Sequence, residues 1–425
     1  MFLKKLNSLP KSMADFIRFA GALADEKRVN AYVVGGFVRD LFLGVDNFDV
    51  DLVIEGDGIA FATECARALN LGLVTHKRFG TATLLGLEGF KVDIASTRKE
   101  AYEKPAALPT VSFGKIEDDL FRRDFTINAM AIGINKHLFG QVVDFYGGQK
   151  DLSAGLLRTL HPLSFIDDPT RILRAARFEQ RFDFKIEKLT LDAIKEAVGR
   201  KMLFQVQKHR LRDELILIFK EKLPSKALKR LYELCGFYYI AGGLRFRKEW
   251  HDLFEETAKK ASWFKEHFLH KRHIELYVMY MSLFFYPLSL KELQKTIHAF
   301  AFHKGESSRL ISLKESFRRA KTELSKKNVM PSAVYRCLEP LSYEVILLIM
   351  VISKNSRVRQ RVEDFLFNLN GQRLHMRGED LGELGIKPGP HYKKILLELL
   401  YAKIDGRIKD KEEELKLAVK LARNR

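Results

Sequence analysis

The chain has 425 residues, and its 73 Lys and Arg side chains outnumber its 54 Asp and Glu side chains, for a formal net charge of +19. This length is too great for one hydrophobic core, so we expect several domains, and the hydrophobic content of 46% is enough to bury them. The three cysteines are widely spaced and form no C-x-x-C pair, which argues against a zinc site and a disulfide framework and suits a reducing cytoplasm.

The excess positive charge lies entirely after residue 150. Residues 1–150 contain 19 basic and 19 acidic side chains, whereas the remaining 275 residues contain 54 and 35. A neutral first part and a strongly basic remainder suit a catalytic head with an arm that binds a polyanion. The alternative is a cationic surface that only maintains solubility.

Two features of the apolar pattern bear on location. The first ten residues are not followed by the long apolar segment of a signal sequence, and the apolar run at residues 345–352 is too short to cross a membrane. We therefore expect a cytoplasmic protein without membrane association.

A glycine pair follows the first strand-like segment, residues 31–34. Gly35 and Gly36 then precede residues 37–43, which have the pattern of a short helix. Glycines at a strand-to-helix junction let backbone N–H groups approach a phosphate, and the helix dipole favours negative charge there. Arg39, one turn into the helix, would place a cation beside the phosphates. We predict a phosphate-binding turn.

Two aspartates one residue apart lie in the next strand-like segment, residues 48–54. Asp49 and Asp51 should point to the same face, because side chains alternate along a strand. Such carboxylates repel each other unless a cation lies between them, and Mg²⁺ prefers one or two carboxylates together with phosphate oxygens. Asp93, in strand-like residues 90–95, is a third candidate acid. The alternatives are two solvated acids on a surface strand and a structural role for Asp93.

Residues 121–131 read Phe-Arg-Arg-Asp-Phe-Thr-Ile-Asn-Ala-Met-Ala. Arg123 is a candidate partner of a triphosphate, Asp124 of a ribose hydroxyl, and Asn128 offers one more polar contact. The alternative is the start of a helix in which Asp124 or Thr126 forms the cap and the arginines are solvated.

Residues 165–178 read Phe-Ile-Asp-Asp-Pro-Thr-Arg-Ile-Leu-Arg-Ala-Ala-Arg-Phe. They predict a helix with Asp167 or Asp168 as its cap and Pro169 in its first turn. From about residue 160 onward, apolar residues recur at three- and four-residue spacing, which predicts helices throughout.

The order and spacing of four motifs resemble the class II tRNA nucleotidyltransferases. The motifs are Gly-Gly-x-Val-Arg-Asp, Asp-x-Asp, Arg-Arg-Asp-Phe-Thr-Ile-Asn-Ala-Met-Ala and Asp-Asp-Pro-x-Arg-x-x-Arg-x-x-Arg-Phe, all within about the first 215 residues. This group includes CCA-adding, CC-adding and A-adding enzymes and the related bacterial poly(A) polymerases, within the DNA polymerase β superfamily.

The resemblance implies an α+β fold in four parts. A nucleotidyltransferase head at residues 1–150 would contain a small mixed sheet of five strands flanked by helices. An all-α neck at 151–222, a body at 223–365 and a tail at 366–425 would follow.

The resemblance also implies roles for the acids and the phosphate-binding residues. Asp49 and Asp51 would hold Mg²⁺ in a two-metal site, with Asp93 as a third catalytic acid. The triphosphate would be bound by Gly36, next to Gly35, and by the arginines Arg39 and Arg123.

By the same resemblance, Asp168 and Arg171 would face the Watson–Crick edge of the incoming base, supported by Arg174 and Arg177. An aspartate accepts and an arginine donates, so together they match adenine or cytosine, whereas uracil or guanine would leave buried groups unpaired. For the three arginines the alternative is a basic helix face that binds tRNA phosphates.

The chain departs from the family pattern in two places. The templating motif begins with Asp167 where the family usually has Glu, although the following Asp168 is retained. The neck motif, usually Glu-Arg-Ile-x-x-Glu, keeps Arg210 and Glu214 but has His209 in the first acidic position.

Residues 97–109 resemble the Arg-x-Glu-x-Tyr-x-x-Pro loop of A-adding enzymes more than the longer loop of many CCA-adding enzymes. The sequence therefore predicts template-independent addition of the terminal A of the CCA end to tRNA, from ATP, with release of pyrophosphate. A full CCA-adding enzyme that also uses CTP and a bacterial poly(A) polymerase are the alternatives. A non-enzymatic RNA-binding protein is disfavoured because both Asp49 and Asp51 are present.

The basic helical arm would hold the acceptor stem and TΨC region of tRNA through shape and phosphate contacts. In the C-terminal region, Lys393 and Lys394 follow Gly389-Pro390 at a helix start, where free backbone N–H groups suit an RNA phosphate. The alternative is a tight turn between helices. No stable protein partner is expected.

Overall fold

The computed structural model describes residues 9–77, 80–101, 105–106, 110–271 and 273–423. The chain divides into two compact units, Met1–Ile218 with Lys226–Tyr239 and Phe219–Ser225 with Ile240–Arg425. The division into head, neck, body and tail stays a prediction.

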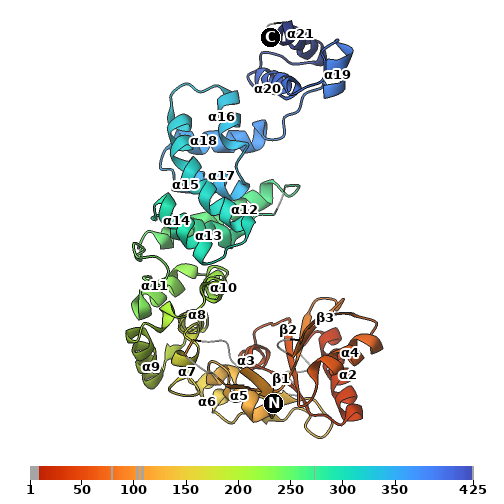
Figure 1. Ribbon diagram of the computed structural model, residues 1–425, viewed down its shortest axis with the longest axis vertical. Helices are drawn as coiled ribbons and strands as arrows, with labels where there is room; N and C mark the ends of the chain where they lie inside the picture. Colours follow the sequence, from red (N-terminus) through yellow and green to blue (C-terminus); the bar gives the residue numbers. More distant parts are fainter. Residues whose placement is uncertain (1–8, 78–79, 102–104, 107–109, 272, 424–425) are drawn as a thin grey trace. The chain divides into compact units, whose positions relative to one another are not determined.

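The first unit contains a seven-stranded mixed sheet with the order β3-β4-β5-β2-β1-β8-β9. Figure 1 labels three of its strands, β1, β2 and β3. Its strands are β1 (Ala31–Val34), β2 (Asp49–Ile54), β3 (Gly72–His76), β4 (Thr81–Leu85), β5 (Lys91–Ser96), β8 (Ala131–Gly133) and β9 (Val142–Val143). The predicted α+β class is confirmed, but the expected number of five strands is wrong. The edge strands β3 and β9 are the ones hardest to predict, because β3 is mostly exposed and β9 has only two residues.

Helices and short elements complete this part of the chain. The helices up to residue 235 are α2 (Lys11–Lys27), α3 (Gly36–Leu43), α4 (Gly58–Ala68), α5 (Ile116–Phe121), α6 (Gly148–Ser153), α7 (Ser164–Asp167), α8 (Arg171–Phe182), α9 (Lys188–Gly199), α10 (Lys208–Phe219) and α11 (Pro224–Cys235), with single 3₁₀ turns at Thr126–Asn128 and Met202–Phe204. A separate hairpin pairs β6 (Arg98–Ala101) with β7 (Thr110–Phe113).

The region after residue 150 is not purely helical. A two-stranded parallel pair joins β10 (Leu156–Leu157) to β11 (Lys185–Ile186) within the segment expected to be all-α. Each strand has only two residues, which is too short for an alternating pattern to appear in the sequence.

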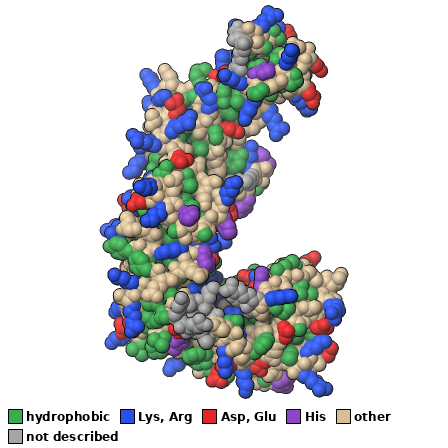
Figure 2. All heavy atoms as spheres, in the orientation of Figure 1, with side chains coloured by type: hydrophobic (Ala, Val, Ile, Leu, Met, Phe, Trp, Pro, Cys, Tyr) green, Lys and Arg blue, Asp and Glu red, His purple; other side chains and the backbone are tan. Residues whose placement is uncertain are grey.

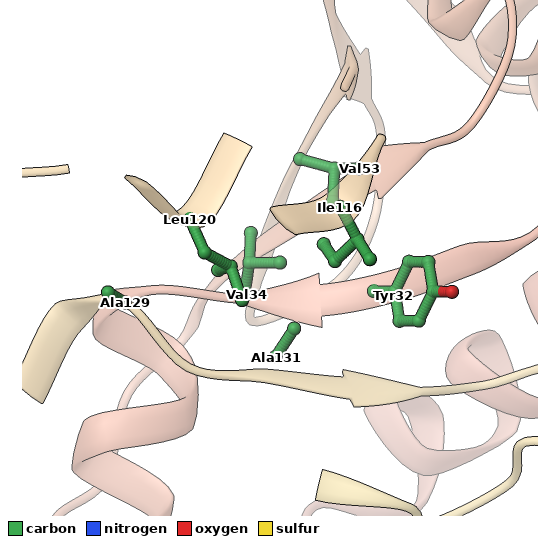
Figure 3. Packing of buried hydrophobic residues seen from close by; sticks show 7 residues of the cluster. All are labelled: Tyr32, Val34, Val53, Ile116, Leu120, Ala129 and Ala131. Atoms are coloured by element: carbon green, nitrogen blue, oxygen red, sulfur yellow. The ribbon is translucent and has the colours of Figure 1, made fainter. Parts of the chain in front are cut away.

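The central strands are buried because helices cover both faces of the sheet. On one face, Ile116 and Leu120 of α5 pack against Tyr32 and Val34 of β1 and Val53 of β2 (Figure 3). The residues of β1 and β2 that alternate with Tyr32, Val34 and Val53 point to the opposite face of the sheet and are also buried. The helices α2 and α4 pack against the sheet and against each other. The sheet is thus a rigid support for the side chains at its ends.

The second unit is helical throughout its described residues. From Trp250 onward its helices are α12 (Trp250–His267), α13 (Leu276–Phe285), α14 (Leu290–Ala299), α15 (Lys304–Ser325), α16 (Pro331–Leu338), α17 (Tyr343–Ile352), α18 (Ser356–Asp364), the π-helical turn η4 (Phe365–Leu369), α19 (Gly378–Glu383), α20 (His391–Ile404) and α21 (Lys411–Arg423). The apolar helices α13 and α17 are almost completely buried. In the described part of the chain, no helix has both the length and the apolar character needed to cross a bilayer.

The last helices have a small core of their own, which includes Leu381, Leu399 and Ala418. Buried Glu414 ties this part together, because its carboxylate accepts hydrogen bonds from the backbone N–H groups of His375 (3.1 Å) and Met376 (2.8 Å) and from Lys403 Nζ (3.0 Å).

Candidate active site

The glycine turn lies where the sheet carries its acidic side chains. Gly35 has φ +71° and donates its N–H to the carbonyl of Met130 (3.1 Å). A Cβ at this position would overlap Nη1 of Arg123, so both the backbone and the space require glycine. Because β1 runs antiparallel to β2, with Val33 opposite Leu52, the turn after β1 lies beside the start of β2.

Asp49 and Asp51 open β2 on the face that further along carries Val53 and the apolar cluster. Asp51 is in register with Asp93 on the adjacent parallel strand β5. Burial raises the pKa of Asp51; Asp93 and Asp49 act in the same direction, and Arg123 opposes them. The structure therefore brings the three predicted acids together on one face of two neighbouring strands.

The three carboxylates differ in their surroundings. Asp93 accepts hydrogen bonds from Thr83 Oγ1 (2.5 Å) and Lys91 Nζ (2.5 Å). Within the described residues, no group of three or more His, Cys, Asp or Glu side chains is arranged to hold a metal ion. The two-carboxylate set of Asp49 and Asp51 nevertheless fits Mg²⁺, which commonly takes its remaining ligands from water and substrate phosphate.

A pocket of about 930 Å³ opens beside Asp51. It is lined by Gly36, Arg39, Asp51, Arg98, Glu100, Thr110, Val111, Arg122, Arg123, Asp124, Asn128, Asp168, Thr170, Arg171, Arg174, Arg177, Phe178, Arg181, Arg210, Asp213 and Glu214. Arginines outnumber carboxylates in this lining, nine to six, so the pocket suits an anionic ligand.

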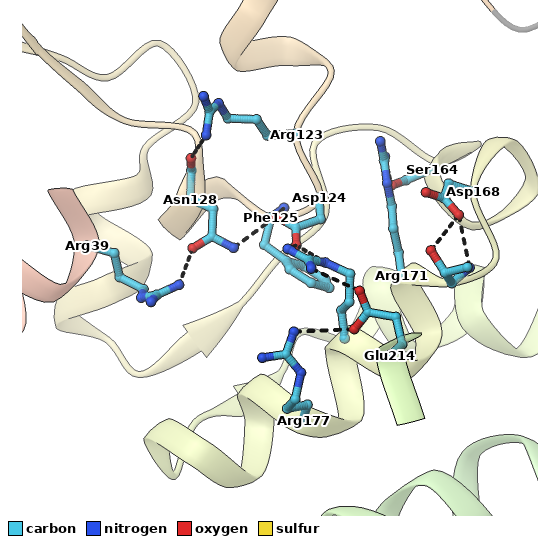
Figure 4. A network of polar contacts seen from close by, with 12 residues as sticks. Arg39, Arg123, Asp124, Phe125, Asn128, Ser164, Asp168, Arg171, Arg177 and Glu214 are labelled. Carbon is cyan, nitrogen blue, oxygen red and sulfur yellow. Dashed lines mark hydrogen bonds and ion pairs between the residues drawn. The ribbon is translucent and has the colours of Figure 1, made fainter. Parts of the chain in front are cut away.

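Arg39 is fixed at the first turn of α3. Its guanidinium donates to Oδ1 of Asn128 (2.6 Å; Figure 4). It also donates to both carboxylate oxygens of Asp40 (2.8 and 2.9 Å) and lies 4.5 Å from the centre of the Phe182 ring. Burial lowers its pKa, and Asp40 opposes this effect. The cation is thus held rigidly at the end of the glycine turn.

Asp124 joins the segment at residues 121–131 to helix α8. It accepts hydrogen bonds from Arg174 Nε (2.7 Å) and Asn128 Nδ2 (2.9 Å) (Figure 4). Burial alone would raise the pKa of Asp124, but Arg174 and Asn128 outweigh it and lower the pKa to about 2. Arg174 also donates to Glu214 (3.1 Å), which accepts from Arg177 as well (3.3 Å).

Asp168 directly follows α7 in extended conformation (φ −134°, ψ 91°), and Thr170, not Asp167 or Asp168 as predicted, is the N-cap residue of α8. Oδ1 of Asp168 accepts from the N–H (3.1 Å) and hydroxyl (2.6 Å) of Thr170, and its Oδ2 accepts from Arg210 Nη2 (2.8 Å). Arg171 is buried and donates to Ser164 Oγ (2.6 Å) and to the carbonyl of Arg122 (2.7 Å). Both predicted base-reading residues are therefore fixed by neighbours.

Several residues in this network received no role from the sequence. Fully buried Asp119 accepts from Arg122 (2.7 Å) and Arg123 (3.0 Å), and Asp40 anchors Arg39. The i,i+3 and i,i+4 spacing of Asp119 to the two arginines is a helical ion-pair pattern that could have indicated this role.

Buried donors at the pocket include Nε of Arg123 and Nη1 of Arg210, and neither atom has a hydrogen-bond partner in the described part of the chain. Leaving a buried donor unpaired is costly, so these groups suit a ligand that brings acceptor atoms.

The predicted nucleotide-binding residues gather in this pocket, apart from Gly35, which adjoins it in the glycine turn. Of the predicted segment 97–109, Arg98 and Glu100 line the pocket, whereas residues 102–104 and 107–109 lie outside the described residues. Lys393 and Lys394 belong to the second unit, where both are exposed at the start of α20.

Two families match the chain. The Poly A polymerase head domain matches residues 31–158, and the family described as probable RNA and SrmB-binding site of polymerase A matches residues 183–240.

Curated relatives named A-adding tRNA nucleotidyltransferase are similar to this chain, among them the following two. The protein from Geobacter sulfurreducens is 37% identical over 97% of this chain, but the chain spans only 48% of its length. The protein from Halalkalibacterium halodurans is 32% identical, over 97% of this chain and 93% of its own. A solved structure of the Thermotoga maritima CCA-adding enzyme complexed with tRNA is 32% identical and superimposes with a TM-score of 0.72, covering 99% of this chain and 98% of that one.

Proposed function

The chain belongs to the class II tRNA nucleotidyltransferase family, and we propose that within this family it adds the terminal adenosine of the CCA end to tRNA, using ATP and releasing pyrophosphate. The observation that carries this proposal is the pocket that joins Asp51, which is in register with Asp93 on the adjacent strand, to a cluster of arginines. In the reaction, the 3′-hydroxyl oxygen of the RNA forms a bond to the α-phosphorus of ATP, the hydroxyl proton is released, and the bond to pyrophosphate breaks. A cytoplasmic location is part of the same proposal.

The triphosphate would lie between the glycine turn and the arginines. Gly36 has no side chain to keep a phosphate from the backbone, and Arg39 is held at the end of the same turn. Arg123 retains an unpaired buried Nε that a phosphate oxygen would satisfy. These groups bind charge that is already present in ATP and position the α-phosphate near the acids.

Asp49 and Asp51 would hold Mg²⁺, which when bound would neutralise phosphate charge and lower the pKa of the attacking hydroxyl. In the described part of the chain, neither carboxylate accepts a side-chain or backbone hydrogen bond, so both remain available to a cation. Asp93 would act beside them through its negative charge, since Lys91 and Thr83 already hold its oxygens.

The base of ATP would be read by Asp168 and Arg171. Both are fixed before any ligand binds, Asp168 by Thr170 and Arg210 and Arg171 by Ser164. Fixed donors and acceptors discriminate strongly, because a base with the wrong edge leaves them unpaired. Asp124 and Asn128 would contact the ribose from the same side of the pocket, while Arg174 and Arg177, both bonded to Glu214, support this wall.

The RNA would be held by the basic helices, with Lys393 and Lys394 among the phosphate contacts. Figure 2 shows Lys and Arg side chains spread over the surface of the helical part of the chain. Contacts of this kind recognise the backbone and shape of the acceptor stem and TΨC region rather than their sequence.

Full CCA addition is the second candidate, because the solved structure with similar fold is a CCA-adding enzyme. The names of the two curated relatives and the short segment at residues 97–109 favour A addition. A decisive experiment offers the purified protein three tRNAs: one lacking CCA, one lacking only the final A, and one complete. Each is tested with every labelled nucleotide. Incorporation of AMP into the second tRNA alone supports A addition, CMP incorporation into the first indicates CCA addition, and extension of the complete tRNA indicates poly(A) synthesis.

A further inference from the structure

An array of aromatic rings leads from the core of the second unit to its surface. Tyr343 contacts Phe264 (5.0 Å between ring centres), Phe264 contacts Phe268 (5.0 Å), and Phe268 contacts Phe367 (5.0 Å). Phe264 and Phe268 are buried, whereas 53% of the surface of Phe367 is exposed. The outer ring is therefore fixed by packing on rigid inner rings.

Two further rings surround Phe367. Trp263 and His267, one turn apart near the end of α12, lie 5.9 Å from its ring centre, at interplanar angles of 76° and 88°. The three rings form a corner, which we call the aromatic corner (Trp263, His267 and Phe367), in which about half of the surface of Phe367 stays exposed. Phe367 reaches this position from the π-helical turn η4, a rare element that often occurs at functional sites.

The charges around the aromatic corner are mainly positive. Residues 259–273 contain four lysines and one arginine but a single acid, Glu266. Lys260 lies over the Trp263 ring (5.2 Å) and pairs with Glu363 of α18 (3.7 Å), and the next residue, Asp364, accepts from Asn368 of η4. An exposed ring beside a cationic segment complements a flat, uncharged base on a negatively charged backbone.

We infer that the aromatic corner stacks an unpaired base of the RNA substrate, with Phe367 as the stacking ring. This inference rests on the proposed function, because that function supplies RNA as the partner. It adds a contact of a different kind from phosphate binding, since stacking needs a ring and not a charge.

The test measures the affinity of the full chain for a labelled tRNA that ends in CC, without ATP and at several salt concentrations. Phe367→Ala should weaken binding by roughly fivefold to a hundredfold, the range found when one stacking ring is removed. Phe367→Tyr, which keeps a ring, should bind as the unmodified protein does. The slope of log affinity against log salt should stay the same in both, because no charge is lost.

Phe145→Ala is the matched control, since Phe145 is also 53% exposed and packs on a neighbouring ring, but lies in the first unit. The two tryptophans add a second readout. Trp250 is buried and Trp263 is part of the corner, so RNA should quench the fluorescence of Trp263, and less so in Phe367→Ala.

The inference is overturned if Phe367→Ala binds the tRNA as tightly as Phe145→Ala, which is also the outcome if the corner serves a protein partner. The inference is also overturned if Phe367→Tyr weakens tRNA binding as much as Phe367→Ala does. Failure of the proposed function looks different: the unmodified protein binds tRNA yet incorporates no AMP, and the stacking comparison can still be made.

Discussion

Asp51 and Asp93 are paired in register on adjacent parallel strands, β2 and β5, but their carboxylates differ in their hydrogen-bond partners. Asp93 is bonded to Lys91 and Thr83, whereas Asp51 accepts no hydrogen bond within the described residues and lines the arginine-rich pocket. Two like charges on neighbouring strands are stable only if cations balance them. This arrangement supports the proposal that Asp49 and Asp51 are the pair that would hold Mg²⁺.

Replacing Asp49 with Ala should abolish nucleotide incorporation and leave tRNA affinity within about twofold. We expect a loss of more than roughly 100-fold, because removal of even an outer-shell partner of a metal site costs 10–100-fold. Incorporation of labelled AMP and a binding titration measure the two quantities.

Asp46→Ala is the control, since Asp46 is an exposed acid three residues before Asp49, in the connection between α3 and β2. It should retain normal incorporation. Full residual turnover in Asp49→Ala would refute the metal role.

The sequence predicts the positions of individual site residues better than their partners. The period of two placed Asp49 and Asp51 on one face, and the glycine pair marked the turn at Gly35, because these features depend on neighbouring residues alone. Asp93 could be predicted as a strand residue, but its register with Asp51 depends on how two distant strands align. The contact of Arg210 with Asp168 likewise joins residues 42 positions apart, and no local pattern encodes it.

Replacing Gly35 with Ala should destabilise the first unit more than replacing Gly36. Gly35 has φ +71°, and a Cβ there would overlap Arg123, so a cost of about 1–3 kcal/mol is expected. At Gly36 a Cβ would lie 3.6 Å from Arg39, an ordinary contact. Urea unfolding followed by far-UV circular dichroism compares the two variants.

The KM for ATP tests the proposed phosphate binding by the turn separately from its effect on stability. The Gly35→Ala and Gly36→Ala variants should both raise this KM, since each places a methyl group beside the proposed phosphate site. Equal stability of the two variants would show that Gly35 is not strained.

Arg171→Ala should reduce the preference for ATP over UTP by about tenfold or more and affect tRNA affinity less. Arg171 is held by Ser164 and by the carbonyl of Arg122, so its donors have a fixed direction, and a fixed donor is what rejects a base with the wrong edge. The ratio of kcat/KM for the two nucleotides measures the effect.

Ser164→Ala provides a graded comparison, because it removes one partner of Arg171 without removing the guanidinium. It should lower the same ratio by a smaller factor. An unchanged nucleotide preference in Arg171→Ala would count against base reading by this residue.

The first unit should lose stability in acid as Asp124 becomes protonated. Burial would raise its pKa, but Arg174 and Asn128 lower it to about 2, from an ordinary value of 3.8. Since the folded pKa lies below the unfolded one, the carboxylate stabilises the fold above about pH 4, by ~2 kcal/mol. This contribution is lost as the pH falls from about 4 to about 2.

Unfolding free energies of the unmodified protein and of Asp124→Asn, measured from pH 7 to pH 2, test this prediction. The difference between them should shrink towards pH 2. A difference that stays constant with pH would contradict the depressed pKa of Asp124.

Replacing both Lys393 and Lys394 with Ala should weaken tRNA binding and flatten its salt dependence. Both side chains are exposed at the start of α20, after Gly389-Pro390, where backbone N–H groups and cations together suit a phosphate. Each phosphate contact contributes about −0.9 to the slope of log affinity against log salt, so the slope should fall in magnitude by up to about 2.

The control pair is Lys416→Ala with Lys420→Ala, which removes the same charge from exposed positions on α21. It should change the slope little if phosphate binding is local to α20, and an equal loss in both pairs would indicate only a general effect of net charge.

The double lysine variant can also be compared with Phe367→Ala. Loss of a phosphate contact lowers both affinity and slope, whereas loss of a stacking ring lowers affinity at constant slope, so the two kinds of contact can be separated on one RNA.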